Sequence, residues 1–199
     1  MAAKEELLDR VVTYATSEGI AGRSLREIAA GVGTSHRMLI YHFGSHEGLL
    51  AAIVAVVEER QRAAMAAITA SSDDPVQAML GLWRQVSAPE LRGAVRLFFS
   101  VFGLAAQGVA GTETLRASLT EPWLTEGVAA AEHLGVAASP EAIRLGVAVS
   151  RGLLLDLVAG ADEASVHASY ALFLEMFAAW SGGFHRRDHE VRGPKRRRS

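Results

Sequence analysis

The side chains that could do chemistry gather between residues 24 and 46. They are polar, basic or soft side chains in a short stretch, namely Ser24, Arg26, Thr34, Ser35, His36, Arg37, Met38, Tyr41, His42 and His46. Arg37 could donate two hydrogen bonds to a guanine edge, and Tyr41 could donate one to a phosphate oxygen. This set predicts contact with DNA if a helix presents it to the major groove. The alternative is a set of exposed polar side chains on a core helix.

Two helix-start signals flank these side chains. Ser24 and Glu27 have the spacing of a capping box, in which each side chain accepts a hydrogen bond from an otherwise unpaired backbone N–H. A helix is therefore predicted to begin at Leu25. Thr34 or Ser35 is predicted to cap a second helix.

The residues around these two starts have the spacing of a helix-turn-helix over about residues 24–43. Ala29 is small enough for two helices to approach closely, and Leu39 packs the second helix onto the first. Gly33 can adopt a left-handed backbone conformation that would cost a residue with a Cβ roughly 1–2 kcal/mol. The second helix would then be the one presented to DNA.

The end of the second predicted helix carries a longer pattern. It resembles the L-x-Y-H-F-x-(S/N)-x-E-x-L-L pattern of TetR-family transcriptional regulators, through Leu39, Tyr41, His42, Phe43, Ser45, Glu47, Leu49 and Leu50. The resemblance implies a helix-turn-helix DNA-binding domain over residues 1–56 and a ligand-binding and dimerisation domain over 57–184. It further implies a homodimer, a repressor in function, that binds double-stranded DNA at a palindromic operator and releases it when a small molecule binds.

The chain departs from this pattern at several positions. Ile40 stands where a second tyrosine is common, and His46 stands where a lysine is common, which weakens one expected phosphate contact. Arg37 and Met38 replace smaller residues and enlarge the surface that would face the bases. His42 and His46 are four residues apart, but a glycine and a serine separate two helices between them, so no shared metal is expected.

Composition limits the remaining classes of function. Half of the 199 residues are apolar, and the formal net charge is −2. The sequence has no cysteine, and this excludes disulfides, thiolate chemistry and cysteine-ligated zinc. No signal peptide or membrane span is expected, so the protein is predicted to be cytoplasmic. No catalytic or cofactor-binding motif is present, and neither enzymatic activity nor a cofactor is expected. Residues 185–199 are predicted to be a basic, disordered tail, with a nonspecific DNA-binding arm as the alternative.

Apolar periodicity predicts an all-α fold of about nine helices. The helix that begins after Ser45 is expected to link the two domains, and residues 103–113 are expected to form a loop. Later helices are predicted over residues 76–86, 91–106, 122–133, 140–159 and 163–180.

The second half of the chain is rich in aromatic residues. Those predicted to bind a ligand are Trp83, Phe98, Phe99, Phe102, Trp123 and Phe177, with Arg96, Gln107, His133 and Arg151 as candidate polar partners. Aromatic residues at helical spacing are usually core, and that is the alternative. A pocket of this composition favours a hydrophobic effector.

Residues 141–180 are predicted to form the dimer interface. Gly146, Ala148 and Gly152 permit close approach of helices, and the resemblance implies a four-helix bundle between two copies. An ordinary interior hairpin is the alternative. For the whole chain, the competing function is a helical small-molecule-binding or scaffold protein with a vestigial helix-turn-helix.

Overall fold

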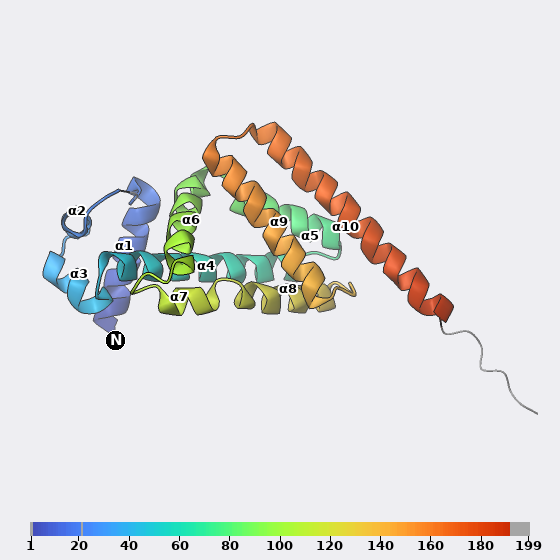
Figure 1. Ribbon diagram of the computed structural model, residues 1–199, viewed down its shortest axis with the longest axis horizontal. Coiled ribbons are helices and arrows are strands. Elements are labelled where there is room, and N and C mark those ends of the chain that lie inside the picture. Colours follow the sequence, from blue (N-terminus) through green and yellow to red (C-terminus); the bar gives the residue numbers. More distant parts are fainter. Residues whose placement is uncertain (1, 21, 192–199) are drawn as a thin grey trace, which may run out of the picture.

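The computed structural model describes residues 2–20 and 22–191, which form an all-α molecule (Figure 1). The predicted fold class is confirmed. The described residues form ten α-helices and one short 3-10 helix, η1: α1 (Ala2–Glu18), α2 (Leu25–Gly31), α3 (His36–Phe43), α4 (His46–Ala70), α5 (Pro75–Val86), η1 (Pro89–Leu91), α6 (Arg92–Ala106), α7 (Glu113–Ser118), α8 (Glu121–His133), α9 (Pro140–Ala159) and α10 (Glu163–Val191).

Two stretches differ from the sequence-based prediction. Helix α7 is additional, and it forms because Leu115 and Leu119, four residues apart, are both buried on one face. Helix α10 continues to Val191, so the predicted end near Trp180 and the predicted tail over residues 185–191 are wrong. Glycine inside a helix costs only about 1 kcal/mol and need not end it, as at Gly182 and Gly183. The rest of the predicted tail, residues 192–199, lies outside the described residues.

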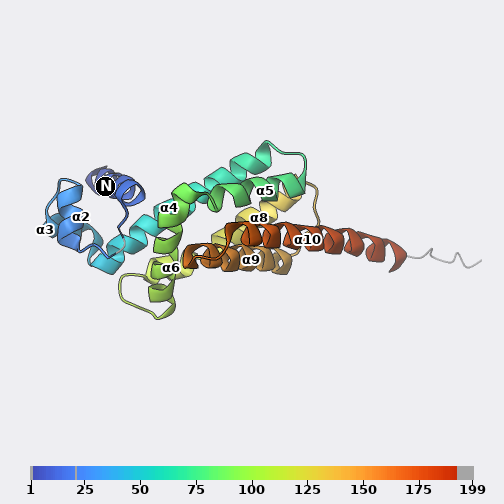
Figure 2. The same ribbon diagram turned by 90° about the horizontal axis from the view of Figure 1, so that it is seen from above.

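The helices are arranged along one long axis. Helices α1, α2 and α3 gather at one end, α4 runs from them along the molecule, and α9 and α10 form an antiparallel hairpin at the other end (Figures 1 and 2). Ser139 caps α9, and Gly160 ends it in a left-handed conformation with φ 96°. Asp162 accepts the backbone N–H of Ser165 at 2.8 Å and so caps the first turn of α10.

Helix α4 crosses the predicted domain boundary at residue 56 without a break. One hydrophobic cluster contains Ile28 and Leu39 of the helix-turn-helix, Leu49 and Ile53 of α4, and Val101 of α6. The core under the DNA-binding helices is therefore continuous with the core under α6. Because close-packed interiors transmit displacement, a movement of α6 or α4 would also displace α3.

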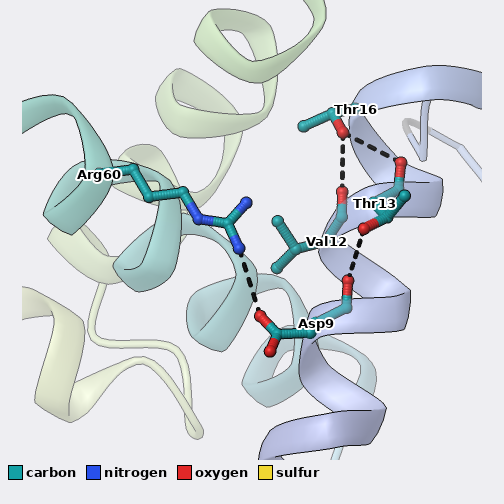
Figure 3. Close-up of polar contacts among 5 residues, drawn as sticks. All are labelled: Asp9, Val12, Thr13, Thr16 and Arg60. Carbon is teal, nitrogen blue, oxygen red and sulfur yellow. Dashed lines mark hydrogen bonds and ion pairs between the residues drawn. The ribbon is translucent and has the colours of Figure 1, made fainter. Parts of the chain in front are cut away.

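An exposed ion pair also joins α1 to α4. Figure 3 shows Arg60 of α4 beside Asp9 of α1, with a distance of 3.2 Å between the guanidinium Nη2 and Oδ1. Thr13 and Thr16 donate back to carbonyl oxygens of their own helix, so they add no bond between helices. An exposed pair of this kind contributes at most about 1 kcal/mol, and the buried Val12 beside it contributes more to holding α1 in place.

No single helix among the described residues is long and apolar enough to cross a membrane. Helices α3 and α4 reach that length and hydropathy only when they are taken together, and they meet at a bend of 68°.

Candidate DNA-binding surface and ligand cavity

The start of α2 has the predicted capping box. The backbone N–H of Ser24 donates to Glu27 Oε2 at 2.8 Å, and the backbone N–H of Glu27 donates to Ser24 Oγ at 3.4 Å. The serine hydroxyl also donates to the same carboxylate. Hydrogen bonds from the Ser24 hydroxyl, then from its backbone N–H, lower the pKa of Glu27. Two residues three positions apart in the sequence therefore fix the first turn of α2.

The turn between α2 and α3 is closed by Gly33. Its φ is +65°, and the backbone N–H of Thr34 donates to the Ala29 carbonyl at 2.9 Å while that of Gly33 donates to Ala30 at 3.3 Å. This pair of bonds is a Schellman motif, which ends a helix on a left-handed residue. The Arg10 guanidinium of α1 donates to the carbonyls of Val32 and Gly33, so α1 holds the turn in place.

Helix α3 presents most of its residues to solvent. Ser35 is its N-cap, accepting the backbone N–H of Met38 at 3.2 Å, which resolves the choice between Thr34 and Ser35. Leu39 is fully buried and anchors the helix, whereas Tyr41 is 78% exposed. The predicted contact residues that lie exposed on or beside α2 and α3 are Ser24, Arg26, Ser35, His36, Arg37, Met38 and Tyr41. Thr34 and His42 are half-buried.

His46 lies at the start of α4 and is held by the loop before α2. Its Nε2 is 3.0 Å from the carbonyl oxygen of Arg23, and its Nδ1 is 3.8 Å from Glu47. Because a carbonyl only accepts, Nε2 carries the proton of that bond. The ring of His46 thus links the start of α4 to the loop before α2, and its contact with a phosphate stays a prediction. Arg23 is also engaged, donating to the Tyr14 hydroxyl and to the Glu18 carbonyl.

Lys4 is a basic residue that the sequence-based prediction missed. Its ammonium nitrogen lies 5.6 Å from the centre of the Phe43 ring, beside the C-terminus of α3. The side chain is exposed, so its charge is available to a phosphate next to Tyr41. The two residues are 39 positions apart in the sequence, so no local pattern indicates their proximity, and only the contact of Lys4 with the Phe43 ring shows it.

The loop from α6 to α7 lies against the N-terminus of α4. A Cβ at Gly111, where φ is +91°, would lie 3.0 Å from Ser45 Oγ and 3.1 Å from the backbone nitrogen of Gly48. Ser45 is the N-cap of α4 and accepts the N–H of Gly48 at 3.0 Å. The contact therefore joins the α6–α7 loop to the junction between α3 and α4.

A cavity of about 360 Å³ lies among α4, α5, α6, α8, α9 and α10. Four of the six aromatic residues predicted to bind a ligand line it, namely Trp83, Phe98, Trp123 and Phe177. Trp83 is buried, stacks on Tyr170 with ring centres 4.3 Å apart, and donates its indole N–H to His167 at 2.9 Å. Its position is fixed from two sides.

Phe99 and Phe102 do not line this cavity, so the structure does not group them with the other four, and their contact with a ligand stays a prediction. Phe99 follows Phe98 by about 100° around α6, and Phe102 lies one turn further along, so both pack against the cluster under the DNA-binding end. Of the candidate polar partners, Arg151 lines the cavity, but Arg96, Gln107 and His133 do not. The last three are exposed.

The charged side chains on the cavity wall are Glu58 of α4 and Arg151 of α9. The indole N–H of Trp123 donates to Glu58 Oε2 at 2.5 Å, and Arg151 Nη2 is 3.9 Å from the same oxygen. Burial raises the pKa of Glu58, opposed by the Trp123 hydrogen bond and then by the Arg151 charge. Burial likewise lowers the pKa of Arg151. Glu58 went unnoticed in the sequence because it begins a polar stretch, EERQR, that resembles an exposed helical face.

The α9–α10 hairpin has an exposed apolar face. Large apolar side chains on it are Leu145 and Leu155 of α9 and Leu172 and Met176 of α10, each about half exposed or more. Ala148 and Gly152 lie exposed between the two leucines of α9. Large apolar side chains exposed on both helices of one hairpin indicate a contact surface.

No cluster of three or more histidine, cysteine, aspartate or glutamate side chains that could hold a metal ion occurs in the part of the chain that the structure describes.

Comparison with known proteins agrees with this architecture. Residues 13–53 match the family model described as bacterial regulatory proteins, tetR family. No curated protein sequence matches the chain.

Solved structures share the fold over nearly the whole chain. A TetR-family transcriptional regulator from Pectobacterium atrosepticum is 20% identical, with a TM-score of 0.66 over 88% of this chain and 91% of that one. One from Rhodococcus sp. is 20% identical, with a TM-score of 0.64 over 90% and 98%. The multidrug binding protein EbrR, solved with ethidium, is 21% identical, with a TM-score of 0.58 over 87% and 97%. Residues 13–53 of this chain therefore match the tetR family of bacterial regulatory proteins, and the chain shares the fold of solved TetR-family transcriptional regulators.

Proposed function

We propose that this protein is a homodimeric repressor that binds a palindromic operator through α3 and releases it when a hydrophobic ligand fills the cavity. The observation that carries the proposal is α3 itself. It is anchored by buried Leu39 and presents Arg37 and Tyr41 to solvent at one end of the molecule. A helix held in this way can enter a major groove without loss of its own core.

The contacts on DNA divide into two kinds. Arg37 and Met38 lie in the first turn of α3, where side chains meet base edges, and an arginine bonded to guanine gives about 1–3 kcal/mol of discrimination. Tyr41 and Lys4 lie near the other end and suit phosphate oxygens, which position the protein without specifying sequence. With a net charge of −2, affinity depends on this local placement rather than on bulk charge.

The dimer is proposed to form through the exposed apolar face of α9 and α10. A second copy of the same face would bury Leu145, Leu155, Leu172 and Met176 in one four-helix contact. Two-fold symmetry makes the operator palindromic, and half-sites one turn of DNA apart require the two α3 helices to lie about 34–36 Å apart.

Ligand release is proposed to act through α4 and α6, which both line the cavity and both reach the DNA-binding end. Helix α4 carries Glu58 on the cavity wall and His46 against the loop before α2. Helix α6 carries Phe98 on the wall, and the loop after it contacts α4 at Gly111. The likeness to EbrR supports a ligand in this cavity. A coupling of about 1–3 kcal/mol would lower operator affinity about 5- to 150-fold.

The test is loss of DNA binding in a variant that stays folded. Arg37→Ala combined with Tyr41→Ala is expected to abolish binding to DNA fragments enriched by the wild-type protein, with helicity and dimeric mass unchanged. Both side chains are exposed, so their truncation removes no core. Retained binding by the double variant would favour a helical ligand-binding or scaffold protein whose helix-turn-helix does not contact DNA.

A further inference from the structure

The cavity is apolar apart from a few side chains, and its charge balance depends on two of them. Glu58 and Arg151 are the charged residues on the wall in the part of the chain that the structure describes. Their Oε2 and Nη2 atoms are 3.9 Å apart, which is an ion pair at its outer limit. The side chain with fewer partners in the protein is the one more available to a ligand, and its charge indicates the charge that the ligand carries.

Arg151 is satisfied by the protein. Its guanidinium donates to the carbonyl of Leu119 and to Thr120 Oγ1, the latter at 3.1 Å. It also lies over two aromatic rings, 5.3 Å from the centre of Phe98 and 6.0 Å from that of Phe102. These contacts orient the guanidinium and partly offset its charge, so Arg151 is less available than Glu58 to a ligand.

Glu58 has fewer partners. Its side chain is 15% exposed, and both of its contacts, from Trp123 and Arg151, fall on Oε2. Oε1 therefore remains open to a donor. Burial raises the pKa of Glu58 in spite of the Trp123 hydrogen bond and the charges of Arg151 and Arg62, so its present partners do not fully compensate the loss of water around the carboxylate.

The cavity walls around Glu58 also favour positive charge. Trp83 and Tyr170 present stacked rings, and Trp123 adds further aromatic surface. The faces of aromatic rings attract cations, most strongly where water is excluded. The same faces, together with the Glu58 carboxylate, would repel an anion.

We propose that the effector is a lipophilic organic cation, an aromatic amine or amidinium, whose charge is met by the Glu58 carboxylate. This rests on the proposed function only in taking the cavity as the effector site. Glu58 is twelve residues after His46 on the same helix, about 18 Å along its axis, so a ligand held by Glu58 acts directly on the helix that supports α3.

The experiment compares three ligands that share one ring system and differ in charge. 2-Naphthylmethylamine is the cation, 2-naphthylmethanol the neutral analogue and 2-naphthoate the anion. Each is titrated by calorimetry into the full chain without DNA near neutral pH. The amine is expected to bind about 10- to 100-fold more tightly than the alcohol, the range of a hydrogen bond to a charged group, and 2-naphthoate more weakly than the alcohol.

Two variants locate the effect. Glu58→Gln keeps an acceptor for Trp123, and it is expected to reduce the affinity of the amine to that of the alcohol while the alcohol is unaffected. Glu59→Gln removes an exposed carboxylate from the next position of α4 and is expected to change none of the three affinities.

An amine that binds no more tightly than the alcohol, or does not bind at all, overturns the proposal without any variant. A preference for the amine that survives Glu58→Gln overturns it as well. Failure of the proposed function has a different signature: the amine shows the expected preference, but a saturating concentration leaves the DNA complex intact.

Discussion

The buried carboxylate of Glu58 lowers the stability of the empty fold but supplies the negative charge that the proposed ligand needs. Burial raises its pKa above the unfolded value, so the folded chain binds more protons than the unfolded chain between those two pKa values. The contribution of Glu58 to stability is therefore full below the unfolded pKa and falls as pH rises through the folded pKa. A ligand cation would offset this loss.

Replacement of this carboxylate should therefore stabilise the empty protein. Glu58→Gln is neutral at every pH and can still accept the hydrogen bond of Trp123, so we expect a higher Tm near neutral pH. The gain should vanish as pH falls toward about 4, where the wild-type side chain is itself protonated. Calorimetric melting over a pH series measures this, with Glu59→Gln as the control. A Glu58→Gln variant that melts below the wild type near neutral pH would contradict it.

Residues whose roles are local could be predicted from the sequence, and those whose roles depend on tertiary packing could not. Ser24 and Glu27 are three apart and bond to each other, so spacing alone locates the cap. His46 bonds a carbonyl 23 residues away, and no local pattern reports this. Phe99 and Phe102 belong to an aromatic run in which sequence alone does not say which ring faces the cavity.

At the scale of elements, the contact between the α6–α7 loop and α4 connects the cavity to the DNA-binding end. Gly108 and Gly111 both lie in this loop with positive φ, +71° and +91°. Alanine at either position costs roughly 1–2 kcal/mol in backbone conformation. At Gly111 alone the new methyl group also meets Ser45 and Gly48, whereas at Gly108 the nearest atom is 3.9 Å away, in Arg116.

The two glycines therefore form a matched pair. Gly111→Ala is expected to displace the start of α4 and to weaken operator binding about 5-fold or more, a shift typical of coupled sites. Gly108→Ala is expected to lower stability alone. Operator titrations of both variants, at a temperature where both are folded, give the comparison. Equal affinities for the two variants would show that this contact does not act on α3.

Element prediction succeeded where periodicity and caps agreed. Ser45, the Pro75 start and the Pro140 start each precede an apolar stripe, and helices begin there. Helix α7 was missed because six residues are too few for a period to show. The extent of α10 was misjudged because glycines lower helix propensity without forbidding a helix.

At the scale of the whole molecule, the exposed face of α9 and α10 is expected to decide the oligomeric state. Leu155→Glu together with Leu172→Glu would place two charges in the proposed contact, and we expect a monomer with weakened operator binding because each half-site then binds alone. Ala66→Glu, an exposed position of α4 away from this face, is the control for added charge. Light scattering after size-exclusion chromatography measures the mass. A double variant of dimeric mass would exclude this face.

The sequence indicates the helix-turn-helix far better than the cavity. The helix-turn-helix is specified by contiguous residues, whereas the cavity is assembled from six helices spread over more than a hundred residues. Its aromatic character was predictable from composition. The pairing of Glu58 with Trp123 and Arg151 was not, because it joins α4, α8 and α9.

Selection of bound duplexes from a random pool by the whole chain tests most directly whether two α3 helices of a dimer bind DNA. We predict enrichment of a palindrome whose half-sites are centred one helical turn, about 34–36 Å, apart, since two α3 helices related by a two-fold axis must meet the same face of DNA. Recovery of no common sequence, or of a single site without two-fold symmetry, would contradict it.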